Sequence, residues 1–154
     1  MTAQAPTGWH VLPPVYFLAA LILMALLHYE LPGAQLIESP WRYIGAVLIA
    51  AGLAWVSWAA LLFRRAGTAI RPYQPSTALV VTGPYRVTRN PMYLAMVVIL
   101  LGTGILFGSA VPFLVVPAFA VLIELRFIRM EEGVLETTFG QAYRDYQAKV
   151  RRWL

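Results

Sequence analysis

The sequence predicts an all-α integral membrane protein with about four transmembrane helices, the last two joined as a tight hairpin, followed by a C-terminal amphipathic helix at the membrane interface. Three observations lead to this fold class. The 154 residues are 60% hydrophobic and only 12% charged, whereas soluble domains carry roughly 25% charged residues. The mean hydropathy is +0.66. Several apolar runs are too long for the core helices of a small soluble domain. We therefore expect a single membrane domain over residues 1–154.

Two spans are predicted in the first half of the chain. Residues 13–29 form an apolar run, and residues 41–63 form a second run that is long enough to cross about 30 Å of hydrocarbon at about 1.5 Å per residue. The region before the first run lacks the basic segment of a signal peptide, and no small-residue cleavage site follows the run. We therefore interpret the first run as a retained span.

The third and fourth apolar runs, residues 92–107 and 111–128, are separated only by Gly108, Ser109 and Ala110. So short a connection predicts a tight helical hairpin. The third run is short for a full crossing of the bilayer. It therefore either takes in Asn90 and Pro91 at its start or ends below the far surface.

Basic residues gather on one predicted side of the membrane. The loop 64–91 carries five arginines and no acid, and six more basic residues lie between residue 126 and the end of the chain. The loop between the first two spans carries Glu30 and Glu38 instead. By the positive-inside rule we expect loop 64–91, segment 129–154 and both termini to be cytoplasmic. A net charge of +5 beside apolar runs indicates anionic lipid headgroups, rather than nucleic acid, as the partner.

The two cytoplasmic segments differ in their predicted structure. The loop is too rich in helix breakers for a continuous helix, with Gly67, Pro72, Pro75, Gly83 and Pro84. The tail instead shows apolar and aromatic residues at steps of four, four, three and four, namely Leu135, Phe139, Tyr143, Tyr146 and Val150. This spacing is typical of one face of an amphipathic helix, which we expect to lie along the interface.

The densest group of polar residues covers positions 82–93, where the loop re-enters the membrane. Part of it reads as helix punctuation, because Asn90 is a good N-cap, Pro91 suits the first helical position, and a Gly-Pro pair favours a turn. Capping does not explain two arginines and two tyrosines in the same segment. They lie at a helix N-terminus, whose free N–H groups attract anions. A carboxylate or phosphate group is therefore an alternative reason for this cluster.

A second group begins with Glu131 and Glu132, just beyond the fourth run. One interpretation is a solvated first turn followed by an aromatic interfacial helix. The other is that these acids lie beside the first group, because a short hairpin makes the ends of the third and fourth runs neighbours, and that a small zwitterionic ligand binds between them. Glu124 lies inside the fourth run and is either a functional intramembrane acid or an interfacial partner of an arginine.

Several chemistries lack support in the sequence. There is no cysteine, His10 and His28 are isolated, and no histidine pair has metal-ligand spacing. No dinucleotide-binding glycine motif, phosphate-binding Walker loop or serine-hydrolase elbow is present. We therefore expect no metal cofactor and no classical nucleotide-binding domain.

Two separated motifs carry a family resemblance. The first runs through Gly67-Thr68, residues 75–80, residues 83–86 and residues 89–94, and the second comprises Glu131-Glu132, Leu135, Phe139-Gly140, Tyr143, Tyr146 and residues 150–152. In this order and position they resemble the isoprenylcysteine carboxyl methyltransferase family, over roughly residues 64–154. The chain departs from the family pattern where members commonly have Arg-His-Pro, because Asn90 replaces the histidine, and at Ala95, where glycine is frequent.

The resemblance implies an integral membrane enzyme that uses S-adenosylmethionine without a Rossmann domain. It implies cofactor-binding residues at Gly83, Pro84, Tyr85, Arg89, Asn90, Pro91, Tyr93, Glu131, Glu132 and Tyr143. The acids would hold the amino or ribose groups of the cofactor. An arginine, or the N–H donors at a helix end, would bind its carboxylate. The acceptor is expected to be lipidic or prenylated and to enter from the bilayer. We expect Arg86, Glu132 and Arg151 to take part in catalysis, the two arginines by contacting an acidic headgroup or terminal carboxylate.

Three kinds of function remain open at this point. Methylation of a carboxylate needs no general base and is the first. The broader group in the resemblance includes phospholipid N-methyltransferases, so methylation of an aminophospholipid, with Glu132 accepting the proton of the amine, is the second. A non-catalytic membrane scaffold or lipid-binding subunit is the third, although anchoring does not require this order of residues. A transporter is disfavoured, because the interior of the first three runs offers no charged side chain for a substrate path.

Overall fold

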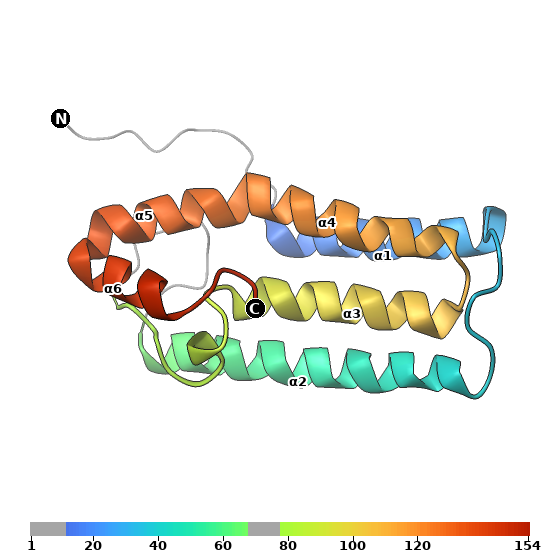
Figure 1. The fold of residues 1–154 in the computed structure, drawn as a ribbon, viewed down its shortest axis with the longest axis horizontal. Coiled ribbons are helices and arrows are strands. Elements are labelled where there is room, and N and C mark those ends of the chain that lie inside the picture. The colour runs from blue at the N-terminus through green and yellow to red at the C-terminus, as the bar shows by residue number, and fades with distance from the viewer. Residues whose placement is uncertain (1–11, 68–77) are drawn as a thin grey trace.

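The computed structural model describes residues 12–67 and 78–154, and within them the regular elements of secondary structure are all helices (Figure 1). The long helices are α1 (Pro13–Glu30), α2 (Ile44–Arg65), α3 (Pro91–Phe107), α4 (Val115–Ile123), α5 (Arg129–Phe139) and α6 (Gln141–Lys149). The predicted all-α membrane fold is confirmed. His10, Arg71, Pro72, and the motif residues Thr68 and 75–77, lie outside the described residues.

Shorter helical turns connect these elements. A 3₁₀ turn, η1 (Trp41–Tyr43), leads into α2, and another, η2 (Gly83–Arg86), precedes α3. A third, η3 (Val111–Leu114), leads into α4, and a π-helical segment, η4 (Glu124–Ile128), joins α4 to α5. Residues 111–139 therefore form one continuous helical rod.

Three helices in the described part of the chain are long and apolar enough to cross a membrane, namely Pro13–Glu30, Trp41–Arg65 and Val111–Phe139. The third run forms the shorter apolar helix α3. This helix begins at Pro91, so the run does take in Pro91 at its start. The helix that contains the fourth run continues beyond residue 128, to Phe139.

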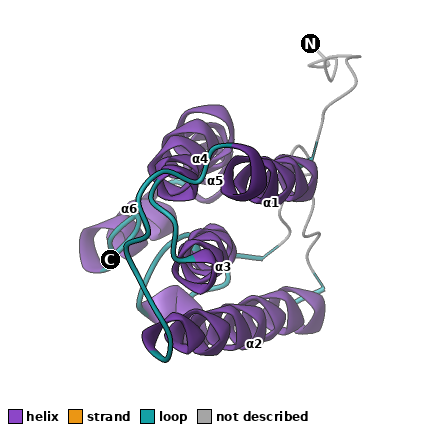
Figure 2. Cartoon of the chain, turned by 90° about the vertical axis from the view of Figure 1, so that its right-hand side faces the viewer, coloured by secondary structure: helices purple, strands orange, loops and turns teal. Residues whose placement is uncertain are grey.

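The long helices lie side by side, with α3 between α2 and the pair formed by α1 and α4 (Figures 1 and 2). Helices α2 and α3 approach at their backbones: a Cβ atom on Gly102 would lie 2.7 Å from the carbonyl oxygen of Gly45. On the other side of α3, the side chains of Met24, Leu100 and Ile123 are completely buried and bring α1, α3 and α4 into one core. Large side chains such as Ile22 and Val47 point outward, as a hydrocarbon surrounding allows.

The predicted hairpin between α3 and α4 is confirmed at residues 108–110. Gly108 adopts a φ of +76°, which ends α3, and its carbonyl oxygen accepts hydrogen bonds from the N–H groups of Leu36 and Ile37. Ser109 is buried, and its hydroxyl lies 2.8 Å from Nδ1 of His28. The loop after α1 and the hairpin thus close one end of the bundle. His28 lies there, at the end opposite α6.

The C-terminal tail differs from the single amphipathic helix that the spacing predicts. The helix is interrupted at Gly140, whose φ of 53° and ψ of −120° are not helical, and α6 begins at the next residue. The chain becomes extended at Val150. Glycine adopts this backbone conformation without the steric cost that a side chain would impose. The break turns α6 back along the bundle end, and Tyr143 and Tyr146 are still buried.

Candidate functional site

The polar residues singled out in the sequence converge at the bundle end that carries α6 and the C-terminus. Figure 1 shows α6, η2 and the first turn of α3 gathered at this end, with α5 on the far side of α6. The last five residues, 150–154, follow α6 as a non-helical segment that runs to the start of α3. We call residues 150–154 the C-terminal strap.

The strap is bound to the segment before α3 by three hydrogen bonds to its backbone. The N–H of Arg89 donates to the carbonyl oxygen of Arg151 at 2.9 Å. The carbonyl oxygen of Arg152 accepts from the Thr88 hydroxyl at 2.9 Å and from the Asn90 side-chain amide at 3.1 Å. Asn90 precedes α3, but its side chain makes no capping hydrogen bond to that helix. The capping interpretation is therefore correct in position and wrong in the role of the side chain.

Helix α6 is attached to η2 through aromatic side chains. The Tyr146 hydroxyl donates to the carbonyl oxygen of Tyr85 at 2.6 Å, and the Tyr85 ring packs on Phe63 of α2 with a centroid distance of 5.3 Å. Burial raises the pKa of Tyr143 to about 12 and also raises the pKa values of Tyr85 and Tyr146. These phenols therefore remain protonated near neutral pH and do not act there as bases.

Glu132 is the centre of the charged network at this end. It is only 7% exposed and accepts a forked set of hydrogen bonds from Arg152, at 2.8 Å to Nη2 and 3.2 Å to Nε. Nη2 of Arg89 lies 3.5 Å from its Oε1 atom. Such bidentate, charge-assisted contacts are among the strong hydrogen bonds of proteins. Two guanidinium groups therefore hold one buried carboxylate in place.

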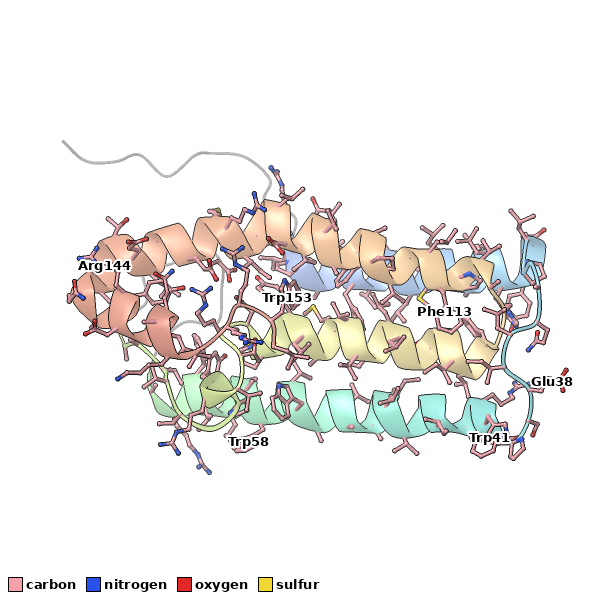
Figure 3. The ribbon with its side chains drawn as sticks, viewed as in Figure 1. Glu38, Trp41, Trp58, Phe113, Arg144 and Trp153 are labelled. Carbon is pink, nitrogen blue, oxygen red and sulfur yellow. The ribbon has the colours of Figure 1, made fainter. Side chains whose placement is uncertain are left out.

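The neighbouring carboxylates have different partners. Glu131 accepts a hydrogen bond from the hydroxyl of Tyr93 at 2.6 Å. Glu124 accepts from Nη1 of Arg152 at 3.1 Å and from the indole N–H of Trp153 at 3.0 Å, with Arg129 at 3.2 Å. Figure 3 shows Trp153 between α3 and the rod above it. Of the two interpretations of Glu124, the structure supports pairing with arginine.

The π-helical segment explains how one arginine reaches two glutamates. At 3.6 residues per turn, side chains eight positions apart on an α-helix point about 80° apart. A π-helical turn takes up one additional residue and removes most of this offset between Glu124 and Glu132. Both therefore face Arg152, whereas Glu131 is turned toward Tyr93 on α3.

The structure brings together most of the expected cofactor residues. Tyr85, Arg89, Asn90, Tyr93, Glu131, Glu132 and Tyr143 surround the start of α3, with Pro84 and Pro91 buried beside them. Gly83 faces α2 instead, because a Cβ atom added to it would meet Leu62 and Trp58 of that helix. The side chains of Arg86 and Arg151 are exposed, outside the network around Glu132.

The polar group at positions 82–93 and the second motif contain Thr88, Tyr146 and Arg152 without indicating a site role for them, and Trp153 lies outside both. Arg152, and not the predicted Arg151, enters the network. In an extended segment adjacent side chains point to opposite sides. The Arg-Arg-Trp sequence therefore signals that one arginine faces inward, but the choice between them depends on the contacts of the strap.

The site offers groups of both signs to a small ligand. Nε of Arg89 is buried and has no hydrogen-bond partner among the described residues. A buried donor of this kind suits a carboxylate, while Glu131 and Glu132 suit amino or hydroxyl groups. The set of residues therefore fits a zwitterionic cofactor such as S-adenosylmethionine. The described residues contain no group of three or more metal-ligating side chains.

Comparisons with known proteins agree with this architecture. A family model described as phospholipid methyltransferase matches residues 41–142, which include η2, α3 and both Glu131 and Glu132. An uncharacterized protein of Haemophilus influenzae is 43% identical over 63 residues, which are 41% of this chain and all of that protein.

A solved structure shows a similar fold. The eukaryotic intramembrane Ras methyltransferase, isoprenylcysteine carboxyl methyltransferase, superposes with a TM-score of 0.70 at 23% identity, over 92% of this chain and 51% of that protein. The chain thus spans about half the length of that protein, and the likeness concerns the fold. The family model, by contrast, covers well over half of the chain. The chain therefore belongs to the phospholipid methyltransferase family of integral membrane proteins.

Proposed function

We propose that this protein is an S-adenosylmethionine-dependent membrane methyltransferase, resembling the isoprenylcysteine carboxyl methyltransferases, that methylates a lipidic or isoprenoid acceptor at the cytoplasmic interface. The observation that carries the proposal is the pairing of Arg89 with the buried carboxylate of Glu132 at the start of α3, next to Glu131, which is bonded to Tyr93 of the same helix. Family membership supports the reaction class. A scaffold that only anchors itself to lipid has no need of buried, paired charges, which are costly to desolvate.

The residues of the site would hold the cofactor by its polar ends. Arg89, with its buried and unpartnered Nε, suits the carboxylate, and the positive end of the α3 dipole favours the same charge. Glu131 and Glu132 suit the amino and ribose groups. When bound, S-adenosylmethionine would supply a methyl group carried on a positively charged sulfur. An incoming nucleophile would attack the methyl carbon in line with the bond to sulfur, and the sulfur would leave. The task of the protein is then to position and desolvate the reactants.

The acceptor determines whether a base is needed. A carboxylate acceptor attacks as it is, so the site needs only to orient it, and the exposed Arg86 and Arg151 are suited to an acidic group near the membrane surface. We propose this carboxyl methylation as the first candidate.

Methylation of an aminophospholipid is the second candidate, and the description of the matching family model favours it. An amine must lose a proton to become a nucleophile, and a carboxylate is the natural acceptor in this site. Both oxygens of Glu132 already accept hydrogen bonds from Arg152, whereas Glu131 has only the Tyr93 hydroxyl as a hydrogen-bond donor among the described residues. For this reaction we therefore assign the proton-accepting role to Glu131 in place of Glu132.

Calorimetric titration of the detergent-purified protein with S-adenosylmethionine and with its demethylated product tests the proposal. We expect saturable binding that is lost or strongly weakened in Glu131→Gln. Glu136→Gln is the matched control, because Glu136 lies on the same helix and is exposed, with only Arg144 as its ion-pair partner among the described residues. A folded, lipid-supplied protein that binds neither compound would refute the methyltransferase assignment.

The acceptor is then identified with a labelled methyl donor. Vesicles containing a prenylated cysteine derivative and vesicles containing phosphatidylethanolamine are offered separately. Base-labile label on the prenylated compound supports carboxyl methylation, and base-stable label on the phospholipid supports N-methylation.

A further inference from the structure

A pocket of about 270 Å³ lies between α2 and α3, beside the cofactor residues. Its walls include Gly52 and Trp55 of α2, Leu94, Ala95 and Val98 of α3, and Leu154 of the strap. Its exposed lining is almost wholly apolar. Small residues create this space, because Gly52 has no side chain and Ala95 contributes a single methyl group.

The position of the pocket indicates what fills it. It lies within the apolar length of α2, in the candidate span Trp41–Arg65, so it opens toward hydrocarbon. Arg64 follows Trp55 by nine residues, or about 14 Å along the helix at about 1.5 Å per residue. Arg86 adjoins Tyr85, which packs on the same end of α2. This spacing of an apolar pocket below exposed arginines suits a lipid with a hydrocarbon chain and an anionic group near its head.

The strap links this pocket to the charged network. Leu154, which forms part of the pocket wall, is two residues from Arg152, whose guanidinium holds Glu132 and Glu124. The backbone of Arg152 is held in turn by Thr88 and Asn90 at the start of α3. The short stretch of chain from Arg152 to Leu154 therefore connects the carboxylate of Glu132 to the wall of the apolar pocket.

We propose that Arg152 is a positioning residue for both reactants: through Glu132 it fixes the cofactor side of the site, and through the strap it sets Leu154 as a wall of a pocket for the hydrocarbon chain of an anionic lipid. The inference rests on the proposed function for the identity of the cofactor. It adds a binding place for the acceptor chain and a residue that ties the two together.

Four substitutions separate this role from a general effect on folding. Arg152→Gln removes the fork to Glu132, and Arg152→Lys keeps the charge without the fork. Leu154→Ala alters the pocket wall and leaves Arg152 intact. Arg129→Gln is the matched control, because Arg129 is the other arginine on Glu124 but is mostly exposed and does not contact the strap in the described residues.

Two binding measurements on the full chain are compared. Calorimetry gives the affinity for the demethylated cofactor product, and quenching of tryptophan fluorescence by phosphatidylglycerol with brominated acyl chains reports a chain beside Trp55. The part of the quenching that is lost in Trp55→Phe is assigned to Trp55. Thermal unfolding of each variant identifies any that fail to fold.

The expected pattern is specific. Arg152→Gln weakens both the cofactor product and the chain, each by about fivefold or more, and Arg152→Lys recovers part of both. Leu154→Ala weakens the chain alone, and Arg129→Gln changes neither. Quenching that is unchanged in Leu154→Ala, or a folded Arg152→Gln with both affinities intact, overturns the inference. If Arg152→Gln does not fold, the result for Leu154→Ala decides.

The inference and the proposed function fail in different ways. Cofactor binding without any quenching at Trp55 overturns the inference alone. An unmodified protein that is quenched but binds no cofactor overturns the proposed function, and the double role of Arg152 with it.

Discussion

At the scale of single residues, the buried carboxylate of Glu132 is the most consequential group in the network. Its negative charge lies between the guanidinium groups of Arg89 and Arg152. Removing one partner of such a group leaves an uncompensated charge in a place that water reaches poorly. Arg152 is about one third exposed, so water reduces this cost on its side.

We expect Glu132→Gln to lower the free energy of unfolding by about 1–3 kcal/mol, because two arginines then face a neutral amide. Denaturant or thermal unfolding in a fixed detergent measures the change. Glu136→Gln, which breaks only the exposed pair with Arg144, should change stability by less than about 0.5 kcal/mol. Equal effects of the two substitutions would show that the buried network is not formed.

Tyr93→Phe separates hydrogen bonding from packing at the same site. The substitution keeps the buried ring and removes the hydroxyl that donates to Glu131 at 2.6 Å. We expect a loss of about 1 kcal/mol in stability and a weaker affinity for S-adenosylmethionine, since Glu131 loses the donor that orients it. Calorimetry provides the affinity. Tyr146→Phe is the comparison, because its hydroxyl binds a backbone carbonyl of η2 and no glutamate.

At the scale of elements, the contact between α2 and α3 depends on glycine. A Cβ atom on Gly45 would meet the carbonyl oxygen of Gly102 and lie 2.6 Å from the backbone nitrogen of Leu106. We expect Gly45→Ala to destabilise the fold by about 1–3 kcal/mol, because backbone atoms cannot give way as flexible side chains do.

Gly133→Ala is the control for that substitution. Gly133 lies in α5 with no neighbouring heavy atom within 4 Å of an added Cβ. Alanine is favoured over glycine in a helix interior, so a gain of up to about 1 kcal/mol is expected. Thermal unfolding of the two variants in the same detergent provides the comparison. A neutral Gly45→Ala would mean that α2 and α3 do not approach as closely as the structure has them.

The π-helical segment offers a second prediction at this scale. Deleting the exposed residue Leu125 should return η4 to α-helical geometry and leave Glu124 and Glu132 seven positions apart, so that their directions differ by only about 20°. Arg152 should then still hold both carboxylates and the indole of Trp153 should keep its partner, whereas a large loss of stability would contradict the view that η4 accommodates one additional residue. Unfolding experiments and the emission of Trp153 test both expectations. Leu125→Ala, which keeps the chain length, should retain the native emission.

Some of these elements could be predicted from the sequence, and others could not. The hairpin followed from three small residues between two apolar runs, and the cluster before α3 followed from its unusual pairing of arginine with tyrosine. The break at Gly140 was hidden, because the apolar spacing from Leu135 to Tyr146 continues across it. The π-helical segment left no local signal either, since its purpose lies in the contacts of Arg152, which is distant in sequence.

At the scale of the whole molecule, the two ends of the bundle are built differently. One end is closed by the hairpin and the loop after α1, with hydrogen bonds to Gly108 and Ser109. The other end holds the ion pairs, the buried tyrosines and the strap. The length between them is covered by exposed apolar side chains. The proposed ligand site therefore lies at one end of the bundle only, and the hairpin closes the opposite end.

Which face is cytoplasmic is a prediction that the absence of cysteine makes straightforward to test. Glu38 and Arg144 lie at opposite ends of the bundle (Figure 3), and both are exposed. Because the chain contains no cysteine, Glu38→Cys and Arg144→Cys each provide a single reactive thiol. By the excess of arginine near the α6 end, we expect a membrane-impermeant maleimide to label Arg144→Cys in inside-out vesicles and Glu38→Cys in intact cells. The reverse pattern would place the site on the other side of the membrane. Labelling of both variants from one side would contradict the spanning arrangement itself.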